Sequence, residues 1–167
     1  MAHIDPITAT RTTSTQFISS KTFHIAGILT TVYGLDNLPP SCTSVSCLWL
    51  LHPRLGTKDR MEDIAIQCIS SWNARRPWDS KRGLLAVAFD QRNHGSREVD
   101  KLANEAWRSG NPRHAQDMFS IYHGTAMDTS LLIDHLGSYI TLPNPATIDE
   151  NYVLGVSLGG HAAWQVL

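Results

Sequence analysis

The most informative part of this 167-residue sequence is Tyr152-Val153-Leu154-Gly155-Val156-Ser157-Leu158-Gly159-Gly160-His161. Apolar residues that favour a strand run into a Gly-x-Ser-x-Gly turn, and small residues that favour a helix follow it. Gly155 and Gly159 flank Ser157 because so tight a turn leaves no room for side chains there. We expect the turn to hold Ser157 in a strained backbone conformation, with its hydroxyl above the edge of a sheet.

A strand, this turn and a helix in succession are the pattern of a nucleophile elbow. The helix would point its free N-terminal N–H groups at any negative charge formed beside the serine. The Gly-x-Ser-x-Gly motif alone is weak, because an ordinary strand–loop–helix link with a surface serine also contains it by chance. The rest of the chain must therefore decide between the two interpretations.

Composition excludes several classes of protein. The 42% hydrophobic and 17% charged content describe a chain that can bury a core and is not a disordered segment. A net charge of −1 without a basic run argues against a nucleic-acid partner. No apolar run approaches the roughly 20 residues of a membrane span, and the first twenty residues contain no apolar h-region, so we do not expect them to be a secretory signal.

Cysteine usage favours a reducing compartment. The sequence has three cysteines, Cys42, Cys47 and Cys68, and their spacing does not match a metal site. Cys42 and Cys47 could pair in a short loop. An odd count without a secretory signal favours free thiols, so we expect a cytoplasmic protein.

The N-terminal part of the chain is expected to be an arm followed by β-structure. Residues 1–14 lack any period and resemble a flexible arm, whereas 15–167 are expected to form one domain. β-Branched and aromatic residues predict two early strands, one over 15–20 and one over 22–33. Glycine and paired prolines then predict a loop over 34–41.

Downstream, buried strands alternate with amphipathic helices. Short apolar runs predict strands over 45–51, 83–89 and about 151–154. A 3.6-residue period predicts one helix that begins after Thr57 and a longer one from His114 to Ile140. This alternation predicts a mostly parallel sheet with helices on both faces, and reactive groups then lie at the carboxyl ends of the strands.

Three loops follow these strands in the order Leu50-Leu51-His52-Pro53, Asp90-Gln91-Arg92-Asn93-His94-Gly95-Ser96 and Gly155-Val156-Ser157-Leu158-Gly159-Gly160. Together they resemble the loops of an α/β-hydrolase. The first is similar to the His-Gly loop of that family, the second to its Asp-x-Arg-Gly-His-Gly-x-Ser loop, and the third to its nucleophile elbow. The resemblance covers about residues 15–167 and implies a sheet of the α/β-hydrolase type.

The resemblance implies a serine hydrolase that acts on an ester, thioester or similar acyl bond of a small molecule. We expect no cofactor, and no metal site because His114 and His123 lack the spacing of metal ligands. Ser157 would be the nucleophile, and the Leu158 amide would be one oxyanion donor. Pro53 stands where the family usually has glycine, and proline has no N–H. The second donor is therefore expected from Arg54, with Leu55 as the alternative.

Other residues of these loops have expected supporting roles. By the same resemblance, His52 would hold the oxyanion loop through hydrogen bonds, and His94 would have a structural role. The apolar Leu55 could line a pocket. His161 follows Ser157 by one helical turn and is expected to be a packed or solvated helix residue rather than a general base.

The sequence departs from the family pattern after the elbow. Only ten residues follow Ser157, and they include no acid, whereas the family places an acid and then a histidine after the serine. The chain thus resembles the N-terminal part of the fold without its C-terminal strands. We expect another chain or a C-terminal fragment to cover the exposed sheet edge.

Two alternatives to a serine hydrolase remain. The chain could be a truncated, catalytically inactive module that binds a ligand or a partner, because it lacks the acid and the base. A flavodoxin-like binding domain would fit the alternation of strands and helices, but it leaves the elbow unexplained.

Overall fold

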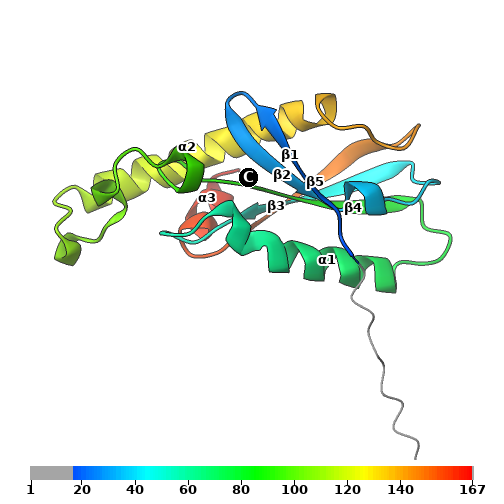
Figure 1. Cartoon of the computed structure of the whole chain (residues 1–167), viewed down its shortest axis with the longest axis horizontal. Helices are drawn as coiled ribbons and strands as arrows, with labels where there is room; N and C mark the ends of the chain where they lie inside the picture. Colours follow the sequence, from blue (N-terminus) through cyan, green and yellow to red (C-terminus); the bar gives the residue numbers. More distant parts are fainter. Residues whose placement is uncertain (1–16, 167) are drawn as a thin grey trace, which may run out of the picture.

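The computed structural model describes residues 17–166, so the arm expected at 1–14 lies outside the described residues. Five strands form one mixed sheet in the order β1-β2-β4-β3-β5 (Figure 1). Their bounds are β1 (Ser20–Ile25), β2 (Ile28–Tyr33), β3 (Ser44–Leu51), β4 (Arg82–Phe89) and β5 (Thr147–Gly155). β1, β2 and β4 pair antiparallel, whereas β4, β3 and β5 run parallel, as the sequence predicts for the last three strands.

The helices in the described residues are α1 (Glu62–Arg75), α2 (His114–His135) and α3 (Leu158–Val166). Short 3-10 helices occur before β3, before α1 and after α2, namely η1 (Leu35–Asn37), η2 (Lys58–Met61) and η6 (Leu136–Ser138). The polar connection between β4 and α2 contains three more, η3 (Gly95–Arg97), η4 (Leu102–Asn104) and η5 (Trp107–Ser109).

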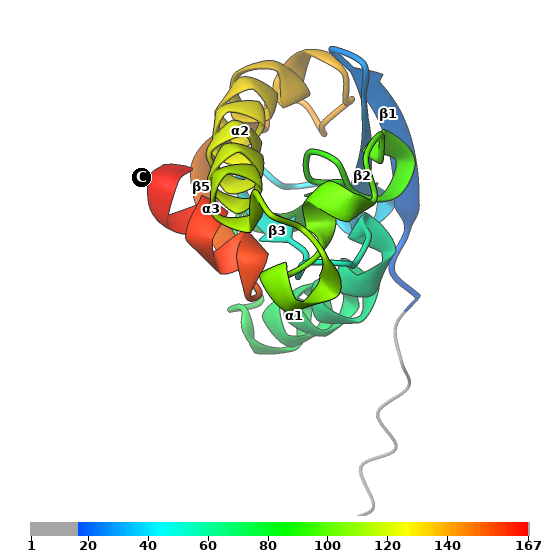
Figure 2. The ribbon, with the colours of Figure 1, turned by 90° about the vertical axis from the view of Figure 1, so that its left-hand side faces the viewer.

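Right-handed crossovers place the helices on opposite faces of the sheet. From β3 the chain passes through α1 to β4 on one side, and from β4 it returns through α2 to β5 on the other side of β3. The two crossover connections move across the sheet in opposite directions, and both are expected to be right-handed. As a result α1 covers one face of the sheet, and α2 and α3 cover the other (Figure 2).

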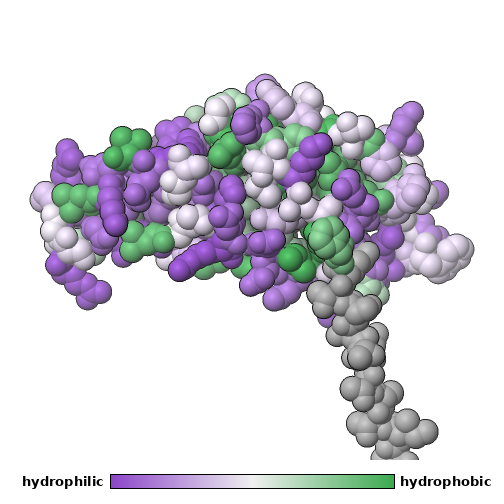
Figure 3. All heavy atoms as spheres, viewed as in Figure 1, coloured by the Kyte–Doolittle hydropathy of each residue, from purple (hydrophilic) through white to green (hydrophobic). Residues whose placement is uncertain are grey.

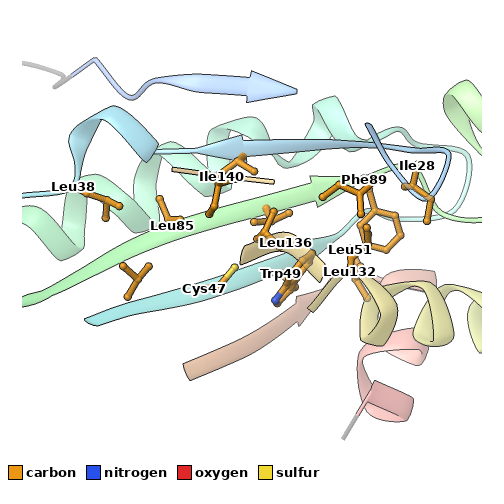
Figure 4. Close-up of a cluster of buried hydrophobic side chains, with 14 of the residues drawn as sticks. Ile28, Leu38, Cys47, Trp49, Leu51, Leu85, Phe89, Leu132, Leu136 and Ile140 are labelled. Atoms are coloured by element: carbon orange, nitrogen blue, oxygen red, sulfur yellow. The ribbon is translucent and has the colours of Figure 1, made fainter. Parts of the chain in front are cut away.

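Alternate residues of the central strands build the two sides of the core. Trp49 and Leu51 of β3 point toward α2 and α3, where they are buried with Leu132 of α2 (Figure 4). Leu50 points to the opposite face and is buried against α1 with Met61. Each fully buried aliphatic side chain contributes about 1.5–3 kcal/mol, and burial on both faces explains why β3 is a nearly continuous apolar run interrupted by Ser46.

The N-terminal hairpin differs from the sequence expectation. The first strand begins at Ser20, and a two-residue turn at Ala26-Gly27 divides the stretch that was expected to be a single strand over 22–33. Both turn residues have positive φ, 49° and 78°, as a tight hairpin with right-handed twist requires. Alanine is not favoured in such turns, so Gly27 was the only residue in the sequence that indicated a turn here.

The strand before the elbow is longer than its apolar run. β5 begins at Thr147, although its first residues are polar, because the Trp49 Nε1 donates to Asn151 Oδ1 at 2.9 Å and Ser46 Oγ donates to Glu150 Oε2 at 2.9 Å. Side chains of β3 thus hold the polar half of β5 in the sheet.

Apolar residues are scattered among hydrophilic ones over the face drawn in Figure 3. Within residues 17–166, no helix combines the length and the apolar character that crossing a membrane requires.

Candidate active site

The loops after β3, β4 and β5 leave the same edge of the sheet because these strands are parallel. Leu50 is paired with Ala88 of β4, and Leu51 is paired with Gly155 of β5, so the three loops begin at almost the same level. The Val156 amide donates to the Leu51 carbonyl at 3.0 Å, and this bond joins the first loop to the third.

Ser157 occupies the turn between β5 and α3. Its φ is 54°, in the left-handed region that non-glycine residues rarely adopt, and its side chain is exposed. The Gly160 amide already donates to the Ser157 carbonyl at 2.9 Å, so the helix starts directly at the serine. This is the backbone conformation that the sequence predicts for a nucleophile elbow.

The two flanking glycines permit close approach of backbone segments. A Cβ at Gly155 would collide with the carbonyl of Gly159, and a Cβ at Gly159 would collide with the Leu51 carbonyl and lie 2.8 Å from the His52 carbonyl oxygen. Only glycine at these two positions lets α3 begin directly against the ends of β5 and β3.

Unpaired backbone amides lie on the elbow and on the loop after β3. Within residues 17–166, the amide of Leu158 has no hydrogen-bond partner, and the same holds for the amides of Arg54 and Leu55. The Gly56 amide donates to the Pro53 carbonyl at 3.1 Å, and Leu55 has a φ of 59°, which describes a tight turn over 53–56. The geometry therefore keeps both Arg54 and Leu55 as candidate donors.

His52 connects the first loop to the second. It is fully buried, its Nδ1–H donates to the Pro53 carbonyl at 2.8 Å, and its Nε2 accepts from the Gln91 amide at 3.0 Å. Because a carbonyl oxygen can only accept, these partners place the proton on Nδ1. Burial lowers the pKa of His52, so the ring is held neutral. Both nitrogens are engaged in positioning the loops, and neither is available as a general base.

Asp90 caps both the η2 turn and the loop after β4. Its carboxylate accepts from the Lys58 amide at 2.8 Å, from the Ser96 amide at 2.9 Å and from the Ser96 hydroxyl at 2.8 Å. Burial alone would raise the pKa of Asp90, but these hydrogen bonds outweigh it and lower the pKa. Thr57 occupies the cap position before η2 without a side-chain cap bond, so Asp90, and not Thr57, accepts from the first amide of η2.

An ion-pair network anchors the second loop to α2. Arg92 binds Asp128 through two bonds of 3.0 and 2.9 Å, and Arg97 approaches the same carboxylate at 2.9 Å. A Cβ at Gly124 would lie 2.5 Å from the Arg92 guanidinium. The glycine that weakens α2 by propensity thus makes room for this arginine. Burial would raise the pKa of Asp128, but bonds from both arginines lower it.

His94 is buried beside His52, with ring centroids 5.5 Å apart. Its Nδ1 donates to the Arg92 carbonyl at 2.9 Å, whereas its Nε2 has no partner within residues 17–166. His94 and Leu55 line a cavity of about 400 Å³ between the first two loops. Ser157 is not among the residues that line it.

Hydrogen bonds of Arg54 and Asn93 hold the long connection after β4 in place, and the sequence did not indicate them. Arg54 Nη1 donates to the carbonyl of the buried Asn104 at 2.8 Å, which ties the first loop to η4. Asn93, with a φ of 57°, accepts from the amides of Val99 and Asp100. Asparagine tolerates the left-handed region, and this tolerance is the signal that could have identified Asn93.

The remaining histidines do not form an acid–base relay. His161 is exposed on α3, and its ring lies 5.6 Å from the ring of Tyr122. His123 Nδ1 lies 3.0 Å from Gln165 Oε1. Within residues 17–166, no histidine side chain hydrogen-bonds a carboxylate, and no group of three His, Cys, Asp or Glu is placed to hold a metal ion.

β5 forms one edge of the sheet, and the surface next to it is apolar and hollowed. Its only strand partner in the described sheet is β3. Trp164 of α3 is 79% exposed, and Tyr152 of β5 is 53% exposed. A hollow of about 300 Å³ lies on the α3 side of β5, and Val153, Gly160 and Trp164 contribute to its lining, whereas Tyr152 does not.

Comparison with known proteins finds similarity at the level of structure. No protein-family model matches the sequence, and no curated protein matches it. The solved structure of TT1662 from Thermus thermophilus is 19% identical with a TM-score of 0.59, and the match covers 88% of this chain and 50% of that one. This chain therefore spans about half the length of TT1662.

Two further solved structures have lower scores. The Vigna radiata epoxide hydrolase VrEH1 is 18% identical with a TM-score of 0.48, over 89% of this chain and 33% of that one. The peroxisomal alpha-beta-hydrolase Lpx1 from Saccharomyces cerevisiae is 16% identical with a TM-score of 0.38, over 90% of this chain and 39% of that one. The likeness to TT1662, together with the mixed sheet and its flanking helices, shows that this chain has an α/β-hydrolase-type fold over about half the length of TT1662.

Proposed function

We propose that this chain supplies the nucleophile and the oxyanion donors of a serine hydrolase that acts on an ester, thioester or similar acyl bond. The observation that carries the proposal is Ser157, which is exposed on a left-handed turn with an unpaired Leu158 amide next to it. A serine that attacks an acyl carbon needs fixed N–H donors for the oxyanion, each worth about 2.7–4 kcal/mol of barrier. The Arg54 amide would be the second donor.

The acid and the histidine base would come from a segment outside these 167 residues. His52 has both nitrogens engaged, and His161 lies on the side of α3 against Tyr122. The open edge of β5 offers a place for such a segment, either from the same polypeptide or from another chain. The three thiols are free and two of them are buried, which suits the reducing cytoplasm.

Mass spectrometry after labelling with a fluorophosphonate tests the proposal. In a polypeptide that contains these residues and their completing segment, we expect one adduct, on the peptide that contains Ser157. Ser157→Ala should abolish both the adduct and acyl hydrolysis. Labelling that survives this substitution would refute the assignment of the nucleophile.

A catalytically inactive binding module is the second candidate, because the described residues contain no acid–base relay. The isolated 167-residue chain distinguishes the two when it is assayed with a p-nitrophenyl ester. Turnover that depends on Ser157 would exclude an inactive module. Absence of an adduct in the completed polypeptide, with the fold intact by circular dichroism, would support it.

A further inference from the structure

The connection between α1 and β4 carries an almost fully exposed tryptophan. Trp78 is 98% exposed, and within residues 17–166 its ring makes no aromatic or cation–π contact. Figure 1 shows this connection at the opposite end of the molecule from the connection between β4 and α2. A single exposed apolar side chain is common on protein surfaces, so the geometry and the charge around it decide what it indicates.

A hydrogen-bonded turn holds Trp78 outward. The Ser80 amide donates to the Pro77 carbonyl at 3.0 Å, which places Trp78 at the second position of a β-turn. The Arg76 amide donates to the Trp72 carbonyl at 2.9 Å, so this turn follows directly on the last bond of α1. The tryptophan thus lies at the tip of a short connection whose backbone is fixed.

Basic side chains surround this turn. Residues 75–82 contain four of the 14 lysines and arginines of the chain but one of its 15 acidic residues. Arg82 is already bound to a carboxylate of β5 through bonds of 2.7 and 3.0 Å. In the part of the chain that the structure describes, the other three, Arg75, Arg76 and Lys81, form no ion pair. Three unpaired cations and one acid give the turn a net charge of +2, in a chain whose net charge is −1.

We propose that this turn docks on an anionic membrane surface. Trp78 would lie among the lipid headgroups, and the three unpaired cations would contact the phosphates and carboxylates of the lipids. Tryptophan favours the boundary between hydrocarbon and water, and each lysine or arginine near an anionic surface adds attraction. One aromatic side chain and three cations make this contact reversible. Phosphatidylserine lies in the leaflet that faces the cytoplasm, the compartment proposed above.

The shape of the turn favours a membrane over a nucleic acid. Proteins that bind single strands combine a basic groove with several aromatic side chains on which bases stack. Here one aromatic side chain projects from a turn, and the groove of about 830 Å³ beside α1 is lined by Pro77 and Ser80 but not by Trp78. A projecting tip suits a soft surface into which it can sink.

Docking through this turn would orient the candidate active site. The turn precedes β4 and lies at the amino ends of the parallel strands, whereas Ser157 follows their carboxyl ends. The serine would therefore face away from the bilayer, toward water-soluble substrates. The inference does not depend on acyl transfer, so Ser157→Ala should bind vesicles as the unmodified chain does.

Co-sedimentation of the 167-residue chain with vesicles tests the inference. One set of vesicles contains phosphatidylcholine alone, and the other also contains about 30% phosphatidylserine. Each net charge contributes a factor of about five, so we expect about 30-fold tighter binding to the anionic set at low salt. The double variant Arg75→Glu, Arg76→Glu should remove this preference. Trp78→Ser should weaken binding to both sets by about fivefold, because it removes the apolar contact.

Two matched controls change the same residue types elsewhere. Trp164→Ser removes a 79% exposed tryptophan from α3. The double variant Arg108→Glu, Arg113→Glu reverses two charges between β4 and α2. Both controls should bind the two sets of vesicles as the unmodified chain does.

Several outcomes would overturn the inference: equal binding to both sets, no binding to either, or a loss with Trp164→Ser as large as with Trp78→Ser. Tighter binding to a single-stranded oligonucleotide than to anionic vesicles would instead assign the turn to a nucleic acid. In the labelling experiment above, an adduct at Ser157 without vesicle binding would refute only the membrane surface. Vesicle binding without an adduct would refute only the hydrolase.

Discussion

Replacing Gly159 by alanine tests the close approach of α3 to β3. The new Cβ would collide with the Leu51 carbonyl and lie 2.6 Å from its carbon, and both atoms belong to the backbone of a central strand. Overpacking of this kind costs about 1–3 kcal/mol. Displacement of Leu51 also weakens the bond from Val156, for about 1 kcal/mol more. Alanine regains about 0.8–1 kcal/mol in helix propensity, so we expect a net loss of about 2 kcal/mol.

Gly160 provides the matched control in the same helix. A Cβ there would lie 3.4 Å from the nearest atom, the Gly155 carbonyl oxygen, which is ordinary contact. Gly160→Ala should therefore stabilise the protein by about 0.8 kcal/mol from helix propensity alone. The two substitutions, one residue apart and chemically identical, should thus change the free energy of unfolding in opposite directions.

Urea unfolding followed by circular dichroism measures both changes. With a slope of about 2 kcal/mol per M, the two variants should differ in midpoint by about 1.4 M. If Gly159→Ala unfolds at the same urea concentration as Gly160→Ala, α3 does not begin against the carbonyls of Leu51 and His52, and the geometry described for the elbow is wrong.

Three further predictions concern the loops that support the elbow. Burial lowers the pKa of His52 in the fold, whereas in the unfolded chain its imidazole binds a proton below the ordinary pKa of 6.5. The free energy of unfolding should therefore fall by up to about 1.4 kcal/mol between pH 7.5 and 5.5. A His52→Gln variant that shows the same pH dependence in urea titrations would contradict this. Gly124→Ala should lower the free energy of unfolding by about 1 kcal/mol, because the new Cβ displaces Arg92. In an Arg92→Ala background the same substitution should raise it by about 0.8 kcal/mol through helix propensity. A double-mutant cycle without this change of sign would show that Arg92 does not pack against Gly124. Asp90→Asn should lower the free energy of unfolding by about 2–3 kcal/mol, because the amide accepts fewer hydrogen bonds than the carboxylate. Since the pKa of Asp90 is lowered from 3.8 in the fold, the stabilisation by the carboxylate is present above that pH and is lost as the pH falls below it toward the lowered pKa. Thermal unfolding of the unmodified chain and the variant at pH 7 and pH 3 checks both statements.

Local periodicity explains why most elements could be predicted. The apolar runs of β3 and β4 and the 3.6-residue pattern of α2 arise from burial within single segments, so the sequence contains them directly. The hairpin at Ala26-Gly27 and the polar half of β5 were missed, because pairing with neighbouring strands, and not local propensity, defines them.

Contacts that hold the candidate site escaped the sequence for a related reason. His52 is engaged by Gln91, and Arg92 is engaged by Asp128, across 39 and 36 positions of the chain. Nothing in the spacing of these residues indicates which side chain binds which, since the partners meet only when the sheet and α2 have assembled.

The sequence by itself determined the tight Gly-x-Ser-x-Gly turn, because the absence of a Cβ at Gly155 and Gly159 is a property of those residues alone. Only the tertiary structure decided that His52 has no nitrogen to spare for catalysis, since both of its partners lie where two loops meet. It also decided that β5, the strand before Ser157, is an edge strand of the sheet formed by residues 17–166. Strand order follows from how the crossovers pack, and no local pattern encodes it.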